Sequence, residues 1–116
     1  MPTMLLSIIL LALAAAPGAN ERRCGWLQNP TPANYWLIDR DGEWTIMVQG
    51  GYQAEGWDEM PDMTTRGWVE TNGHYGHGCA CMDVTTDRRT RRITRIVSAT
   101  PLPLARCPAD RRLPRL

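Results

Sequence analysis

The sequence lacks lysine and phenylalanine altogether, so its 13 basic residues are all arginine and its aromatic residues are five tryptophans and three tyrosines. We attribute the exclusive use of arginine first to genomic bias and only second to a chemical requirement. The formal net charge of +1 argues against a general nucleic-acid binder or membrane-surface binder. We therefore expect no nucleic-acid partner.

The charges are unevenly placed along the chain. Residues 41–83 carry eight acids and one arginine, whereas nine arginines and two aspartates follow residue 83. Two interpretations stay open. The two halves attract each other within one fold, which we favour, or the arginines form a basic face that meets an anionic partner.

Long hydrophobic runs are almost absent, and the exception lies between Met4 and Ala16. It is followed by Pro17-Gly18-Ala19, and an apolar run that ends in small residues is typical of a secretory signal peptide. The run is shorter than the ~20 residues needed to span a bilayer. We expect residues 1–19 to be a cleaved signal peptide, the mature chain to have no membrane span, and the protein to be periplasmic or secreted.

The rest of the chain, about 100 residues, suffices for one domain with a thin core. We expect a single domain over residues 20–107, followed by a flexible tail over residues 108–116. We also expect a monomer.

Signatures of catalysis are missing as well. The sequence has no serine nucleophile elbow, no HExxH and no phosphate-binding glycine loop. An acid/base pair for hydrolysis could come from a single loop that holds Glu55, Asp58, Glu59 and Asp62. Four acids in one polar loop are more often a solvated surface. We expect a non-catalytic protein without a cofactor, and a small envelope hydrolase is the third hypothesis.

Short β-prone runs dominate what is present. The clearest is a hairpin in which residues 35–38 and 44–49 flank Asp41-Gly42, a pair that tolerates the positive φ angles of a tight turn. In the second run Trp44, Ile46 and Val48 share one face, which we expect to be buried. We also expect Trp44, and either Tyr35 or Trp36, in the core.

Further strands are predicted at residues 68–71, 79–85 and 91–98, although the last run also has the spacing of a helix face. Residues 29–34 contain two prolines and are expected to form a rigid loop ahead of the first strand. About five strands and little helix predict a mostly β fold, a small antiparallel sheet or barrel. Barrels of the OB type and of the SH3 type both fit this count.

Four cysteines in an exported domain of this size predict two disulfides. Cys79 and Cys81 point to the same side of one strand, with Cα atoms about 6.5–7 Å apart. That separation is at the limit of disulfide reach, so they should not pair with each other. Cys24 then bonds Cys79 while Cys81 bonds Cys107, or Cys24 bonds Cys81 while Cys79 bonds Cys107.

Several short motifs together resemble those of a family of small exported bacterial proteins, the domain-of-unknown-function family 4087. The motifs are Cys24-Gly25-Trp26, Asn29-Pro30-Thr31-Pro32, Asp41-Gly42-x-Trp44, Gln49-Gly50-Gly51-Tyr52-Gln53-Ala54, Cys79-Ala80-Cys81 and Leu102-Pro103-Leu104-Ala105-Arg106-Cys107. The resemblance covers roughly Cys24 to Cys107. It implies export and a single small domain, and it brings no catalytic residue because the family carries no assigned activity.

One candidate site is a metal centre. His74, His77, Cys79 and Cys81 are zinc or copper ligands within a short stretch. Their spacing is not that of paired Cys-x2-Cys motifs, and thiols in an oxidising compartment tend to form disulfides. The metal site is therefore the alternative hypothesis.

The candidate that we favour is a binding surface on two glycine-rich loops, residues 49–57 and 73–78. Its binding residues would be Tyr52, Gln53, Trp57, His74 and Tyr75. Exposed aromatic rings beside polar groups suit recognition of a protein, peptide or glycan. We expect a binding or inhibitory module that recognises such a partner in the cell envelope.

Overall fold

The computed structural model describes residues 19–116. The expected signal peptide, residues 1–19, therefore lies outside the described residues except for Ala19. In the part that is described, no helix is long and apolar enough to cross a membrane.

The protein is mostly β, as the sequence predicts, with six strands where about five were expected. The strands are β1 (Glu21–Thr31), β2 (Asn34–Asp39), β3 (Gly42–Met47), β4 (Val69–Asn72), β5 (Tyr75–Asp87) and β6 (Arg92–Leu102). A 3-10 turn, η1 (Trp57–Glu59), and a short helix, α1 (Arg106–Ala109), are the helical elements of residues 19–116. The run that also fitted a helix is thus strand β6.

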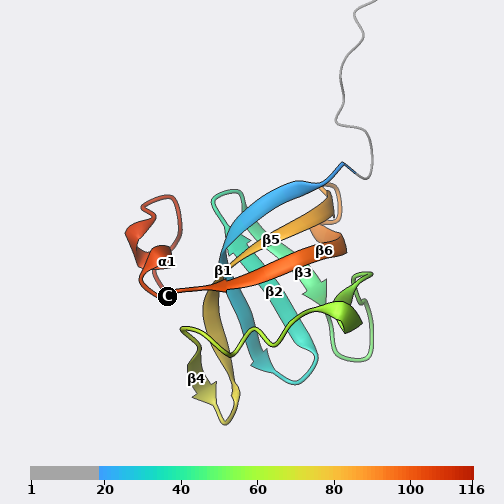
Figure 1. Cartoon of the computed structure of the whole chain (residues 1–116). Helices are drawn as coiled ribbons and strands as arrows, with labels where there is room; N and C mark the ends of the chain where they lie inside the picture. Colours follow the sequence, from blue (N-terminus) through green and yellow to red (C-terminus); the bar gives the residue numbers. More distant parts are fainter. Residues whose placement is uncertain (1–18) are drawn as a thin grey trace, which may run out of the picture.

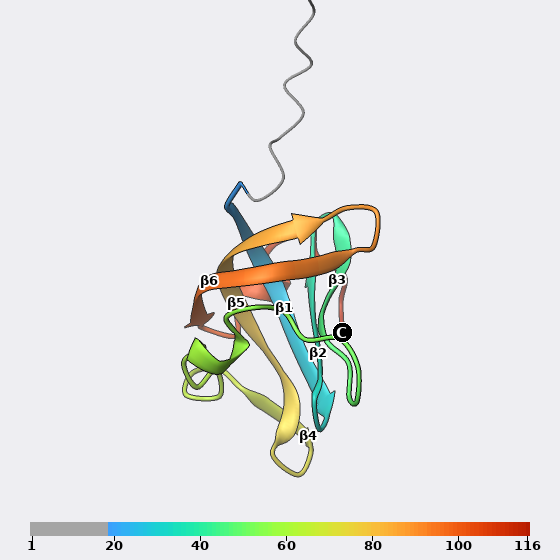
Figure 2. The same cartoon turned by 90° about the vertical axis from the view of Figure 1, so that its right-hand side faces the viewer.

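The sheet closes on itself. Its order is β1-β2-β3-β6-β5-β4, and β1 also pairs with β5. Five strands therefore form a ring, and β4 extends from β5 as an outer edge (Figures 1 and 2). The contact between β3 and β6 is parallel and short, at Thr45 and Arg92. This order, with a parallel contact between the third and the last strand, corresponds to an OB-type barrel.

The expected loop at residues 29–34 is wrong for most of its length, because β1 continues to Thr31. Asn29 still pairs with Gly76 of β5, and Thr31 pairs with Asn34 of β2. The register of β1 against β2 shifts between Gln28 and Thr31, which is where Pro30 lies. A bulge leaves a residue without a ladder bond, so a proline is tolerated there.

Alternate side chains of the strands fill the barrel. The largest fully buried ones are Trp44, Leu27, Leu37, Ile46, Met82, Ile93 and Val84. Trp44 is thus a core residue, as expected, and Tyr35 packs against the core. Val48, expected on the same face as Trp44, follows the end of β3 and is 47% exposed.

Both predicted disulfides are present, and the second of the two connectivities is the observed one. Cys24 and Cys81 are register partners on β1 and β5, and they bond each other. Cys79 bonds Cys107 of α1, which fastens the C-terminal segment to the barrel.

A second apolar cluster lies outside the barrel. Trp26, Cys79 and Cys107 are its buried members, with Leu104 and Leu113 packed against them. The indole Nε1 of Trp26 donates a hydrogen bond of 3.0 Å to the carbonyl oxygen of Pro114. Residues 108–116 therefore contact the barrel, and their expected flexibility stays a prediction.

Candidate functional site

The long connection from β3 to β4, residues 48–68, is fastened to the barrel before it reaches η1. Both backbone groups of Glu55 bond to β6. Its N–H donates to Thr94 O at 3.0 Å, and its carbonyl accepts from Ile96 N at 2.8 Å. Gly56 follows with φ 82°, and a Cβ there would lie 2.2 Å from Ile96 O. Glycine at this position lets the chain turn closely over β6, and the turn fixes where Trp57 emerges.

Beyond this anchor, the connection and the barrel enclose a cleft of about 360 Å³, which we call the aromatic cleft. The barrel contributes Leu27, Asn29 and Tyr35. The connection contributes Trp57, Asp58, Met60, Pro61, Asp62, Met63, Thr64 and Trp68. Residues from distant parts of the sequence therefore line one cavity.

Three rings define the aromatic cleft. The ring centroids of Tyr35 and Trp57 are 4.1 Å apart with planes inclined at 54°. The indole Nε1 of Trp68 donates to His74 O at 3.1 Å, which orients that ring. Burial raises the pKa of Tyr35, and the charges of Tyr75 and Asp62 add to this effect. The phenol of Tyr35 is therefore neutral at physiological pH and remains able to donate a hydrogen bond.

The aromatic cleft is acidic. Asp62 Oδ1 accepts hydrogen bonds from Thr64 Oγ1 at 2.6 Å and from Thr64 N at 2.9 Å. These bonds lower the pKa of Asp62, which keeps the carboxylate charged. Asp58 makes no ion pair or side-chain hydrogen bond with any other residue of the described chain. No arginine or histidine is among the lining residues between positions 19 and 116, so the two carboxylates have no basic neighbour in the cleft.

The structure brings only part of the predicted binding surface to this cleft. Trp57 lines it. The hydroxyl of Tyr52 donates to Ile93 O at 2.8 Å, and its ring lies under the guanidinium of Arg92. Tyr52 therefore packs against β6 of the barrel instead of lining the cleft. Gln53 is exposed and forms a bridge with Met47 of β3.

The other two predicted residues lie at the β4–β5 hairpin. The side chain of His74 is 98% exposed and faces Glu70 at 3.6 Å. Tyr75 begins β5 and is half-buried. Neither lines the aromatic cleft. Tyr35 and Trp68, which do line it, were missed because they look like ordinary strand residues in the sequence.

The alternative metal site is not assembled. Cys79 and Cys81 are both in disulfides, so neither offers a thiolate to a metal. His77 packs edge-on against Trp26, with centroids 5.6 Å apart, while His74 is at the hairpin tip. Residues 19–116 hold no group of three His, Cys, Asp or Glu side chains placed to bind a metal ion.

The acids proposed for hydrolysis are divided by the structure. All four are exposed, but Asp58 and Asp62 line the aromatic cleft, whereas Glu55 and Glu59 lie outside it. A general acid needs a raised pKa, and that of Asp62 is lowered by its hydrogen bonds. The arrangement suits binding of a positive or polar group better than proton transfer.

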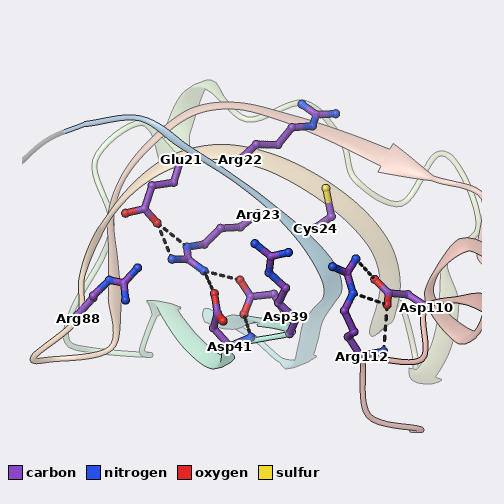
Figure 3. Close-up of a pocket in the computed structure, with 10 residues that line it drawn as sticks. Glu21, Arg22, Arg23, Cys24, Asp39, Asp41, Arg88, Asp110 and Arg112 are labelled. Atoms are coloured by element: carbon purple, nitrogen blue, oxygen red, sulfur yellow. Dashed lines mark hydrogen bonds and ion pairs between the residues drawn. The ribbon is translucent and has the colours of Figure 1, made fainter. Parts of the chain in front are cut away.

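A second cleft of about 430 Å³ lies where β1 begins, beside the turn from β2 to β3 (Figure 3). Its lining is almost entirely charged and comprises Glu21, Arg22, Arg23, Cys24, Asp39, Arg40, Asp41, Arg88, Asp110 and Arg112. At its centre the buried Arg23 donates to Glu21, Asp39 and Asp41 at 2.8, 2.8 and 3.0 Å. Burial alone would lower the pKa of Arg23, but these three hydrogen bonds raise it.

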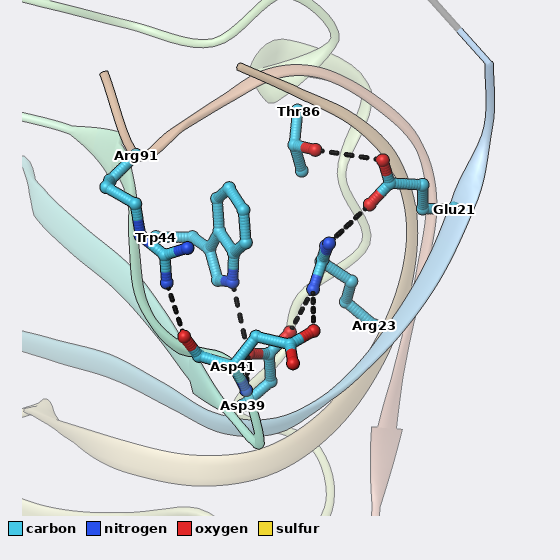
Figure 4. Close-up of polar contacts among 7 residues, drawn as sticks. All are labelled: Glu21, Arg23, Asp39, Asp41, Trp44, Thr86 and Arg91. Atoms are coloured by element: carbon cyan, nitrogen blue, oxygen red, sulfur yellow. Dashed lines mark hydrogen bonds and ion pairs between the residues drawn. The ribbon is translucent and has the colours of Figure 1, made fainter. Parts of the chain in front are cut away.

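The same arginine joins an aromatic stack (Figure 4). The indole of Trp44 lies between the guanidinium groups of Arg23 and Arg91, which are 4.1 and 3.8 Å from the ring centroid. Trp44 Nε1 donates to Asp39 at 3.1 Å, and Arg91 donates to the carbonyl of Asp41 at 2.7 Å. This network connects β1 to the turn between β2 and β3 and to the turn between β5 and β6. Because its donors already have partners, we assign it to stability.

No curated protein and no solved structure matches the chain. The family described as "Protein of unknown function (DUF4087)" matches residues 18–114, which include strands β1 to β6, both disulfides and all the lining residues of both clefts. The chain belongs to the DUF4087 family.

Proposed function

We propose that this protein is a non-catalytic binding or inhibitory module that acts in the cell envelope after export, as a monomer. Its partner is an envelope protein, peptide or glycan, held in the aromatic cleft. The observation that carries this proposal is that Tyr35, Trp57 and Trp68 converge on one cavity with two charged aspartates. Aromatic rings beside charged groups that have no basic partner in the cleft are typical of recognition sites.

The anchoring of the cleft supports the same function. Two backbone hydrogen bonds of Glu55 and the close approach of Gly56 to β6 hold the loop on which Trp57 is carried. Binding to a preformed site costs less conformational entropy than binding to a mobile loop. Two disulfides stabilise the small domain that carries the cleft.

The apolar run that predicts a signal peptide over residues 1–19, together with the disulfides, favours an oxidising compartment, the periplasm or the medium. Cell fractionation with an antibody to the mature domain tests the location. The protein should appear in the periplasmic or secreted fraction, with its first residue near Asn20.

Affinity capture tests the site. The mature protein is immobilised and exposed to envelope extract, and the retained component is purified and titrated against three variants. Trp57→Ala should weaken binding at least about tenfold, which is typical for loss of a central aromatic contact. Trp36→Ala is the matched control, because Trp36 is half-buried on β2 and does not line the cleft.

Tyr52→Phe is the second control, since the Tyr52 hydroxyl donates its hydrogen bond to the carbonyl oxygen of Ile93 and not to the cleft. Each variant is first checked for both disulfides and for cooperative unfolding. Equal binding by Trp57→Ala and the parent would exclude the aromatic cleft as the binding site.

A further inference from the structure

The chain repeatedly covers its own aromatic rings with guanidinium groups. Trp44 has one arginine on each face, and Arg92 lies 4.3 Å from the ring centroid of Tyr52. In a chain without lysine, arginine is the only long basic side chain that can do this. Guanidinium stacks well on aromatic faces because it is planar and weakly hydrated.

The aromatic cleft has the matching components without the cation. Tyr35, Trp57 and Trp68 supply the rings, and within residues 19–116 no guanidinium lies over any of them. Asp58 and Asp62 supply negative charge, and the lowered pKa of Asp62 keeps it ionised. By comparison, the network around Trp44 pairs its carboxylates with Arg23 and with the chain itself.

The size of the cleft limits what can enter. A volume of about 360 Å³ is at the small end of ligand sites, so it accommodates one long side chain or a single sugar ring. Leu27, Met60 and Met63 give the lining an apolar part that suits methylene groups. A neutral sugar would leave the two exposed carboxylates at the cleft without a positive partner, whereas a cation would complement their charge.

From these observations we propose that the aromatic cleft binds an arginine side chain presented by an extended segment of a partner protein. This inference rests on the proposed binding function and names its ligand. The guanidinium stacks against the rings of the cleft and pairs with Asp58 and Asp62. Its methylene stem contacts the methionines.

The test uses short peptides and the indole N–H signals of the isotopically labelled mature protein. The probe is acetyl-Gly-Arg-Gly-amide, and its control is the same peptide with citrulline, which has almost the same shape and no charge. The arginine peptide should shift the signals of Trp57 and Trp68 and leave that of Trp44 unchanged. The citrulline peptide should bind at least about fivefold more weakly, which is the scale of a partly screened charge contact.

Two double variants with the same change of charge separate a local contact from the general field. Asp58→Asn with Asp62→Asn should weaken binding of the arginine peptide about tenfold. Glu55→Gln with Glu59→Gln removes two exposed acids of the same connection that lie outside the cleft, and it should have little effect. Equal losses in both double variants would overturn the inference.

Three further results would also overturn it. They are equal binding of the arginine and citrulline peptides, stronger shifts with a neutral N-acetylglucosamine trimer, and shifts of Trp57 that depend on protein concentration alone. The last would identify a second copy of this chain as the occupant. If Trp57→Ala abolishes capture of the envelope partner while Asp58→Asn with Asp62→Asn preserves it, the binding function stands and only the arginine ligand fails.

Discussion

Cys24 and Cys81 are directly opposite each other on β1 and β5, and their Cα atoms are 4.0 Å apart. Cys79, two residues earlier on β5, faces Trp26 instead and bonds Cys107. The strand register thus decides a connectivity that spacing alone leaves open. It also explains why one strand joins both ends of the domain to the barrel.

The disulfide between Cys24 and Cys81 should contribute to stability through the unfolded chain, in which it closes a loop with a sequence separation of 57. Replacing both cysteines by alanine should lower the free energy of unfolding by about 2–4 kcal/mol. Urea denaturation of the variant and parent measures this. Peptide mapping without reductant gives the connectivity, and a fragment that links Cys24 to Cys79 would contradict the register of β1 and β5.

Arg23 is the residue whose loss should be most damaging outside the apolar core. Its side chain is 6% exposed and holds Glu21, Asp39 and Asp41. Arg23→Met removes the positive charge and leaves buried Asp39 without its ion pair, which should cost about 3–5 kcal/mol. Arg22→Met is the matched control, because Arg22 is 61% exposed and its contact with Asp83 is 3.5 Å long. A similar loss in both variants would argue against the network.

Lowering the pH should destabilise the folded protein. The hydrogen bond from Arg23 lowers the pKa of Asp41, and hydrogen bonds from Thr64 lower that of Asp62, both from an ordinary value of 3.8. A lowered folded-state pKa gives stability that is fully present above pH 3.8 and is lost as pH falls through the folded value. Thermal unfolding between pH 2 and 6 should show this loss, and Asp62→Asn should reduce its size. A midpoint that does not vary with pH would contradict it.

Sequence periodicity was enough to predict the β2–β3 hairpin and the inward face of β5, where Ala80, Met82 and Val84 alternate with cysteine and polar residues. It failed for β1. The inward positions of that strand include Arg23, Gly25 and Asn29, which do not look like a core face. Arg23 can be buried at such a position only because carboxylates 16 and 18 positions later fold back onto it.

The candidate site was predicted in part for a related reason. Trp57 attracts attention because it follows glycines in a loop, and the neighbouring acids are visible in the sequence. Tyr35 and Trp68 lie in or beside strand-forming runs, so local pattern assigns them to packing. Only closure of the barrel and anchoring of the β3–β4 connection bring them together.

The C-terminal segment should depend on one indole. Trp26 Nε1 donates to Pro114 O at 3.0 Å, and Leu113 packs on the same outer cluster. Trp26→Phe keeps an aromatic ring but removes the donor. Amide exchange of residues 110–116 should therefore become faster, while exchange in β1 and β5 stays slow. Trp36→Phe, on the neighbouring strand β2, controls for loss of an indole elsewhere on the barrel. If these amides already exchange as fast as an unfolded peptide in the parent, the tail is free and the contact with Trp26 does not hold it.

The anchor of the aromatic cleft should depend on glycine at one position and tolerate replacement at another. Gly56 has φ 82°, and a Cβ there would lie 2.2 Å from Ile96 O, whereas Gly50 has φ 71° and open space around it. Gly50→Ala therefore carries only the backbone strain, about 1 kcal/mol. Gly56→Ala adds a clash with a backbone oxygen, so the connection must move away from β6, and the loss should exceed that of Gly50→Ala by at least about 2 kcal/mol. Urea denaturation gives both values, and the indole signal of Trp57 should shift in Gly56→Ala alone. Equal losses would mean that the contact with Ile96 does not fix the loop, and the preformed cleft would lose its support.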